Sequence, residues 1–263
     1  TEAIDSRERV RWCVALHKAI AAYLGENAPP LVTGKYSQLV RQPANRLALQ
    51  YLSADEFTAS NCAAQVPFGA FIVLAPADAD PAELRRVEAA LNSIKRVFLS
   101  RSSEVMLGER FGVDAVTFWR YPADGHVRFW SPVPGLIPET RRQRGQSWSL
   151  VDAALLSIGH VLRERYEIDG ERLSYRDLVS AVRSDGVVIH DARLIPDSRI
   201  ERYAHRTPEG VVVQPYSALI DLGGLIPETT LCALGQSRHL GGGLLLPMDV
   251  PIAIADSRYG ARR

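Results

Sequence analysis

Ala233-Leu-Gly-Gln-Ser-Arg-His-Leu-Gly-Gly-Gly-Leu-Leu-Leu-Pro247 places four glycines around an Arg-His pair and follows them at once with an apolar run. Glycine adopts positive φ easily and lets another backbone approach closely, and consecutive free N–H groups in such a loop form an anion-binding concavity. With Arg238 and His239 as sources of charge, the stretch predicts a backbone cradle for phosphate. A glycine-rich hairpin with an exposed Arg-His tip is the alternative, because an isolated glycine-rich match is weak evidence. The four glycines are Gly235, Gly241, Gly242 and Gly243.

The length and composition are those of an ordinary globular protein. With 263 residues, of which 46% are hydrophobic, the chain can bury one large core or two small ones, and two domains of about 100–150 residues are expected. No run approaches the roughly 20 apolar residues that a membrane span requires. The polar start Thr1–Arg9 lacks the apolar core of a signal peptide. We therefore expect a cytoplasmic protein without a membrane partner.

The spacing of the cysteines and the kind of basic residue present bear on which functions are possible. Cys13, Cys62 and Cys232 form no C-x-x-C pair, so neither a disulfide framework nor a structural zinc site is predicted. The formal net charge is +1, yet all but three of the 31 basic residues are arginines. Arginine is the side chain suited to bidentate phosphate contacts, although the base composition of a genome also produces such a bias.

The basic residues are also segregated along the chain. Residues 27–54 and 229–248 contain no carboxylate, and residues 141–144 have only Glu139 close by. Such unneutralised patches on a protein of nearly zero net charge predict a focused site for a polyanion. The basic residues of these patches include Lys35, Arg41, Arg46, Arg141, Arg142, Arg144 and Arg238.

The amino-terminal half has the spacing of alternating helices and strands. Apolar spacing predicts a helix over 6–24 closed by Gly25, although residues 9–16 also alternate as a strand would. A proline in first position marks the start of a helix over 80–98. Strands are expected over 46–52, 69–74, 115–119 and 127–130.

The carboxy-terminal half follows a proline-rich and arginine-rich segment, 132–146, which is the expected domain boundary and should lie on the surface. Ser149 caps a predicted helix over 149–166, in which His160 reads as a packing residue, and Ser174 opens a second helix that runs to about 183. The remaining expectations are strands over 186–190, 203–206, 210–214 and 243–246 and a short helix over 227–234.

This element order predicts an α+β fold in which helices cover one face of antiparallel sheets. The economical arrangement is a pair of tandem ferredoxin-like, or RRM-like, domains. The first would span residues 1–135, and the second would span residues 146–263 and carry the glycine-rich loop, residues 235–243.

Known catalytic motifs are missing from the sequence. Thr33-Gly-Lys-Tyr-Ser37 is not a nucleotide-binding P-loop, and no H-E-x-x-H, G-x-S-x-G or two-metal aspartate pattern is visible. Chemistry without a metal or another cofactor is therefore expected. RNA carries its own nucleophile, the 2′-hydroxyl, and arginines can align that oxygen with the adjacent phosphate and stabilise the developing charge. Acid–base assistance by a histidine is an optional addition.

The pattern Gly-x-Ser-Arg-His-x-Gly-Gly-Gly over residues 235–243, followed by an apolar strand, resembles the glycine-rich loop of the RAMP superfamily of CRISPR systems. Within it, the chain is most similar to the small endonucleases that process precursor CRISPR RNA, and its size and arginine bias resemble the type IV branch. The resemblance implies tandem ferredoxin-like domains, metal-independent cleavage at the base of a repeat hairpin, and retention of the product in an effector complex with other CRISPR subunits. The chain lacks the early, well-marked catalytic histidine of the commoner branches.

The resemblance also implies roles for individual residues. Arg238 would contact the scissile phosphate, with Arg41, Arg46 and His239 as further catalytic candidates. His17 is a second candidate base, although a helical histidine is usually structural. A non-catalytic RAMP subunit that binds the crRNA handle is the first alternative, and an unrelated globular protein with a tight hairpin is the second. The candidate RNA-binding residues are Lys35, Tyr36, Gly235, Ser237, Gly241, Gly242, Gly243, Arg141, Arg142 and Arg144.

Overall fold

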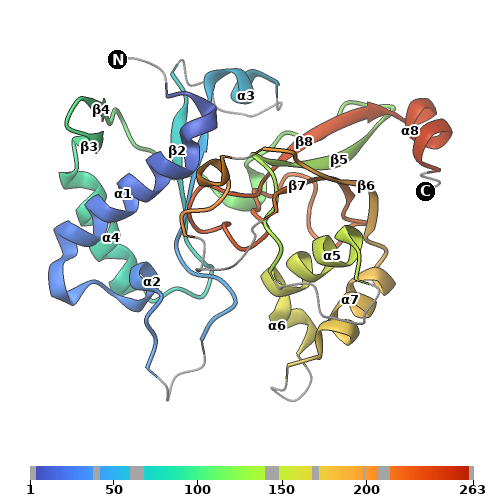
Figure 1. Cartoon of the computed structure of the whole chain (residues 1–263), viewed down its shortest axis with the longest axis horizontal. Helices are drawn as coiled ribbons and strands as arrows, with labels where there is room; N and C mark the ends of the chain where they lie inside the picture. The colour runs from blue at the N-terminus through green and yellow to red at the C-terminus, as the bar shows by residue number, and fades with distance from the viewer. Residues whose placement is uncertain are drawn as a thin grey trace.

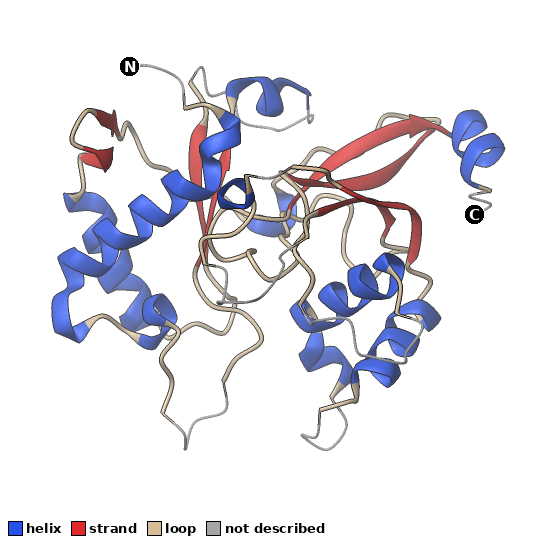
Figure 2. Cartoon of the chain, viewed as in Figure 1, coloured by secondary structure: helices blue, strands red, loops and turns tan. Residues whose placement is uncertain are grey.

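The computed structural model describes residues 4–37, 42–59, 68–139, 148–167, 172–197, 199–206 and 214–260. It has a mixed α+β fold with antiparallel sheets, as the element order predicts. Two lobes lie side by side in Figure 1, one built from the amino-terminal elements and the other from the carboxy-terminal elements. Loops make up most of the region between them (Figure 2).

The amino-terminal lobe is built around one long helix and two small sheets. β1 pairs antiparallel with β2, with Ala48 opposite Leu74, and β3 pairs antiparallel with β4. Its elements are η1 (Ser6–Glu8), α1 (Arg9–Leu24), η2 (Gly25–Asn27), α2 (Pro30–Thr33), β1 (Ala48–Leu52), α3 (Ala54–Ala59), β2 (Ala70–Leu74), α4 (Pro81–Ser93), β3 (Arg96–Ser100) and β4 (Ser103–Met106).

Strand β1 is buried on both faces and links the two lobes. Leu49 and Tyr51 pack in the core of the amino-terminal lobe with α1. The side chains of a strand alternate between faces, so Leu52 points the other way and joins the core of the carboxy-terminal lobe. The two lobes therefore share a strand between their cores.

The carboxy-terminal lobe contains a four-stranded antiparallel sheet with the order β6-β7-β5-β8. Trp130 and Ile220 face the core beneath α5 and α7, whereas Phe129 and Leu219 face α8 on the opposite side. Its elements are η3 (Ala115–Thr117), β5 (His126–Val133), α5 (Leu150–Val161), α6 (Arg163–Tyr166), α7 (Tyr175–Ser184), β6 (Val188–Leu194), η4 (Ile200–Arg202), β7 (Tyr216–Asp221), β8 (Leu244–Pro251) and α8 (Ile252–Tyr259).

Several predicted elements are confirmed, together with the capping that starts them. The helix over 6–24 is η1 followed by α1, and the strands at 46–52 and 69–74 are β1 and β2. Ser149 and Asp152 form a reciprocal capping box at α5, and the Ser174 hydroxyl accepts the Asp177 N–H at the start of α7. The capping residues in the sequence were therefore sufficient to locate the starts of these two helices.

Other predicted elements are wrong because tertiary pairing overrides the local pattern. The helix from Pro81 ends at Ser93, where Ile94 turns extended and the chain enters β3. The expected strand at 115–119 is a 3₁₀ turn that Asp114 caps. The expected helix over 227–234 is a loop, in which Cys232 and Leu234 pair with the start of β8.

Three further expectations concern the segments between these elements. Residues 203–206 form no strand, and residues 210–213 lie outside the described part of the chain. The segment 132–146 was expected on the surface, but Leu136 and Ile137 are buried. β5 precedes the predicted boundary at residue 135, yet it pairs with β7 and β8. Within the described ranges, no helix is long and apolar enough to cross a membrane.

Candidate nucleic-acid interface

The glycine-rich loop, residues 235–243, docks on strand β1 of the other lobe. The Leu49 N–H donates to the His239 carbonyl at 3.0 Å, and the Gly241 N–H donates to the Leu49 carbonyl at 2.7 Å. The buried Gln50 side chain donates to the Arg238 carbonyl at 2.6 Å and to the Gly242 carbonyl at 3.2 Å. The loop thus extends β1 as a short parallel bridge and fastens one lobe to the other.

Two glycines of the loop are required by close packing. Gly241 has φ +84°, and a Cβ there would lie 3.0 Å from both the Cys13 sulfur and the Val10 Cα of α1. Gly243 has φ +65°, and its Cβ would lie 1.9 Å from the Leu234 carbonyl oxygen. An L side chain is strained at such φ values and has no room at either position.

The expected cradle of free backbone N–H groups is wrong for most of this loop. The Gln236 N–H donates to Ile137, and the N–H groups of Leu240 and Gly242 both donate to the Ser237 carbonyl. Those of Arg238 and Gly241 donate to Gly235 and Leu49. These N–H groups already donate hydrogen bonds within the protein because the loop is packed between the lobes, where an unpaired polar group is energetically costly. Any anion held nearby must therefore be bound by side chains.

Arg238 is not an exposed tip but a buried anchor. Its guanidinium forms an ion pair with Glu139 at 2.6 Å, and the two side chains are only 12% and 13% exposed. It also donates to the carbonyls of Gly235 and Ala44. Burial raises the pKa of Glu139 more than the nearby Arg238 lowers it. The alternative of a glycine-rich hairpin with an exposed Arg-His tip is therefore wrong.

Arg46 and His239 lie beside this anchor. The Arg46 guanidinium packs on Gly34, where its Nη1 would be 1.7 Å from an added Cβ. Burial and the neighbouring Arg238 lower the pKa of Arg46. The same causes, with Arg46 as a further cation, lower the pKa of His239 to about 3, so its imidazole is neutral at neutral pH. The Nδ1 of His239 is buried without a hydrogen-bond partner.

The end of α5 brings a second group of basic residues to the same place. The Asn45 amide donates to the Val161 carbonyl at 2.9 Å, and Arg163 donates to the carbonyl of Gln42. His160 therefore lies next to the segment that also receives Arg238. Burial lowers the pKa of His160 to about 4, and Arg238, Arg163 and Arg172 lower it as well. We call the following set the junction cluster: Arg46, His160, Arg163, Arg172, Arg238 and His239.

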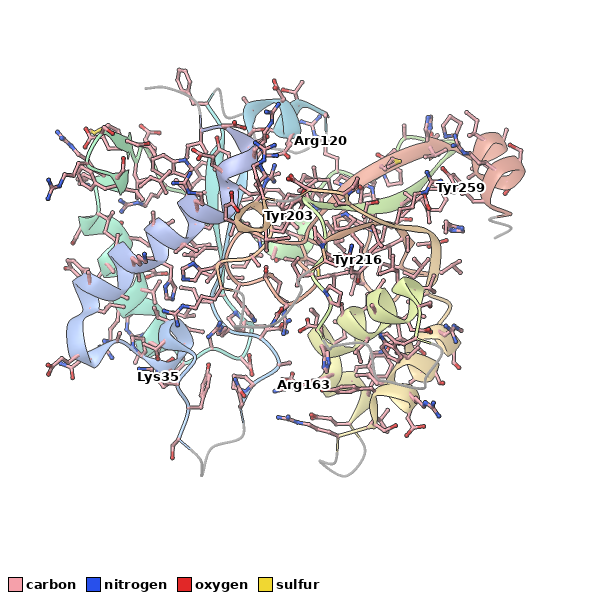
Figure 3. All side chains as sticks on the ribbon, viewed as in Figure 1. Lys35, Arg120, Arg163, Tyr203, Tyr216 and Tyr259 are labelled. Atoms are coloured by element: carbon pink, nitrogen blue, oxygen red, sulfur yellow. The ribbon has the colours of Figure 1, made fainter. Side chains whose placement is uncertain are left out.

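The other predicted residues lie around this cluster or outside the described residues. Lys35 is exposed and comes from the lobe opposite to that of Arg163 (Figure 3). Tyr36 is half-buried, and Arg46 is the cation that acts on it, although burial and two carboxylates raise its pKa. The His17 Nε2 contacts the Val32 carbonyl at 2.9 Å. Arg41, Arg141, Arg142 and Arg144 lie outside the described part of the chain.

His160, Arg163 and Arg172 are not among the site residues that the sequence predicts. Helical spacing located His160 correctly on a helix, but it carried no signal that the end of α5 meets residues 42–46. No group of three or more His, Cys, Asp or Glu side chains suited to a metal ion occurs among the described residues. No protein-family model matches this chain, and no curated protein matches it either. The candidate site therefore rests on its own geometry.

Proposed function

We propose that this chain is an endoribonuclease that cleaves precursor CRISPR RNA at the repeat stem-loop, without a metal ion, and stays bound to the mature product within an effector complex. The junction cluster carries this proposal. Four arginines from different segments converge on two imidazoles that are neutral at neutral pH. Packing of the hydrophobic core does not require so many like charges in one place.

The charges of the cluster repel one another, which favours an anionic ligand. Arg238 lowers the pKa of both Arg46 and His160, so these two groups lie in its positive field. Within the described residues, the guanidinium groups of Arg46 and Arg172 have neither a hydrogen bond nor an ion pair. A phosphate placed here would relieve the repulsion and accept hydrogen bonds from guanidinium groups, which bind phosphate in a bidentate manner. A polyanion such as RNA fits this requirement.

The same groups suit RNA transesterification. In that reaction the 2′-oxygen attacks the adjacent phosphorus and negative charge grows on the phosphate oxygens. Arginines fixed by the fold stabilise this charge without having to reorganise. Arg238 is held by Glu139 and two carbonyls, so its position is set before RNA arrives, while Arg46 would make the direct contact.

The strand order of the carboxy-terminal lobe supports the kind of domain proposed. A helical crossover joins β5 to β6, β6 pairs with β7, and a second crossover leads to β8 at the opposite edge of the sheet. This order resembles the β-α-β-β-α-β order of a ferredoxin-like domain, except that the second crossover contains the glycine-rich loop where such a domain has a helix. In the amino-terminal lobe the described strands form two separate pairs, so the proposal of a second such domain has no equivalent support there.

A non-catalytic subunit that binds the crRNA handle is the second candidate function. Two structural features favour it. Arg238 is paired with Glu139, and most N–H groups of the glycine-rich loop already donate hydrogen bonds within the protein. Its cluster would bind the RNA backbone in the same way and would cleave nothing.

The experiment that tests the proposal uses a labelled RNA hairpin transcribed from the CRISPR repeats of the source genome. Purified protein is incubated with this RNA in excess chelator, beside an RNA with a 2′-deoxy group at the cleaved nucleotide. We expect cleavage of the all-ribose RNA to survive chelation, and the deoxy RNA to bind without being cleaved. Tight binding without cleavage of either RNA would establish the second candidate instead. Failure to bind either RNA would refute both.

A further inference from the structure

We infer that His160 is the catalytic base of the proposed cleavage, the group that takes the proton from the attacking 2′-hydroxyl. This inference rests on the proposed function and assigns a residue of the same site that the sequence pattern did not indicate. It follows from the placement of the imidazole at the end of α5 and from the partners of the other histidines.

The ring of His160 is held in place while its nitrogens stay available. It lies partly buried on the last turn of α5 and meets the Tyr175 ring edge to face at 5.6 Å with an interplanar angle of 88°. Neither ring nitrogen has a hydrogen-bond partner among the described residues. A histidine with a packed ring and two available nitrogens can reach a substrate hydroxyl, as a general base must.

The other histidines near the cluster lack this freedom. The Nδ1 of His239 is buried without a hydrogen-bond partner, and the Arg46 backbone lies against the ring. The Nε2 of His17 is engaged with the Val32 carbonyl of α2 at 2.9 Å. His160 is the histidine of the junction cluster that combines access with proximity to the arginines.

Among the described residues, the groups that act on or contact His160 come from four segments, and the charged ones are arginines. They are Arg238 of the glycine-rich loop, Arg163 of α6, Arg172 before α7, and Tyr175 of α7. Burial and the positive field of the three arginines lower the pKa of His160 to about 4, so the imidazole is unprotonated at neutral pH. A bound phosphate would neutralise part of the positive field and raise this pKa, which makes the imidazole a stronger base when the substrate is present.

The step conserves atoms and protons. His160 accepts the 2′-hydroxyl proton while the 2′-oxygen bonds to phosphorus and the bond between phosphorus and the 5′-oxygen breaks. The 5′-oxygen takes a proton from water, and His160 returns its proton to solvent. The products are a 2′,3′-cyclic phosphate and a 5′-hydroxyl, and no oxidant or other co-reactant is needed.

The first test compares single-turnover cleavage of the repeat hairpin by the wild type, His160→Gln and His126→Gln. His126 lies at the start of β5, opposite Pro251, outside the junction cluster, and serves as the matched control. We expect His160→Gln to cleave about 100- to 10,000-fold more slowly with unchanged affinity for the deoxy RNA. The control should cleave at the wild-type rate.

The pH profile separates a base from a structural residue. The wild-type rate should level off above the pKa of His160 in the complex, whereas the rate of His160→Gln should keep rising with hydroxide concentration. If the wild type and His160→Gln cleave equally fast and with the same pH profile, the inference is overturned and the proposed function stands. A wild type that cleaves nothing would overturn both.

A second measurement does not depend on the folding of a variant. The ring protons of His160 in the wild type are titrated by NMR, free and with the deoxy hairpin bound. We expect the pKa to lie well below 6.5 in the free protein and to rise by at least one unit in the complex. An unchanged pKa in the complex would show that no phosphate reaches His160 and would refute the inference.

Discussion

Replacement of Gly241 by alanine tests whether the glycine-rich loop is packed on the amino-terminal lobe as described. Gly241 has φ +84°, and an added Cβ would lie 3.0 Å from the Val10 Cα and 3.1 Å from the Arg9 carbonyl oxygen of α1. The unfavourable φ costs about 1–2 kcal/mol. Crowding against a helix backbone adds about 1–3 kcal/mol, as overpacking does elsewhere. We expect the free energy of unfolding to fall by about 2–5 kcal/mol in total.

Gly186→Ala provides the matched control. Gly186 has φ +85°, and the nearest atom to its added Cβ is the Gly223 carbonyl oxygen at 4.0 Å. This variant therefore carries the backbone cost alone, about 1–2 kcal/mol. The difference between the two variants isolates the contact between the loop and α1.

The assay is thermal unfolding followed by circular dichroism, with urea unfolding to obtain free energies. In a chain of this size, 1 kcal/mol shifts the midpoint by about 2–4 °C. We expect Gly241→Ala to unfold several degrees below Gly186→Ala. Equal midpoints for the two variants would refute the proposed packing of the loop on α1.

Three further outcomes follow from other contacts. Asp249→Ala removes the carboxylate that pairs with the buried Arg128 at 2.7 Å. Urea unfolding should show that the free energy of unfolding falls by about 3–5 kcal/mol. As a comparison, Arg183→Ala removes the exposed partner of Asp152 and should lower it by less than about 1 kcal/mol. His239 has a pKa lowered from 6.5 to about 3, so below pH 6.5 the unfolded chain takes up a proton that the folded chain does not, and stability should fall as the pH drops from 6.5 toward 3. Urea unfolding across this range should show a shallower fall for His239→Gln, and an unchanged slope would contradict the pKa. Glu139→Gln removes the carboxylate that neutralises Arg238, so the affinity for the repeat RNA should fall more steeply with salt than in the wild type, and an unchanged slope would show that Arg238 does not act on the RNA.

The fold could be predicted from the sequence where the signals are local. Gly25 after the apolar spacing of α1, the proline that opens α4, and Ser149 at the start of α5 each marked an element boundary correctly. The end of α4 was missed because residues 94–98 are compatible with a helix until β4 pairs with them. The segment at 227–234 was missed because its backbone pairs with β8 instead of with itself.

The candidate site could be predicted only in part, since it forms where distant segments meet. The sequence predicted that the glycine-rich loop and the acid-free segment at 27–54 supply arginines to one site, and Arg46 and Arg238 do lie close together. The role of the glycines was misjudged, because a sequence does not say whether a glycine approaches a ligand or a helix. Gly241 approaches α1. His160 was interpreted as a packing residue, since the contact between α5 and residues 42–46 spans more than a hundred positions of sequence.

The salt dependence of RNA binding, measured for single arginine variants, tests most directly whether RNA binds at the lobe junction. The dissociation constant of the labelled repeat hairpin is measured over a range of salt for the wild type, Arg46→Gln and Arg193→Gln. Arg193 is 77% exposed, pairs with Asp191 on β6, and serves as the control. Loss of one phosphate contact should reduce the slope of log affinity against log salt by about 0.7–0.9 for Arg46→Gln, with the control at the wild-type slope. Equal slopes for all three proteins would contradict RNA binding at the junction cluster.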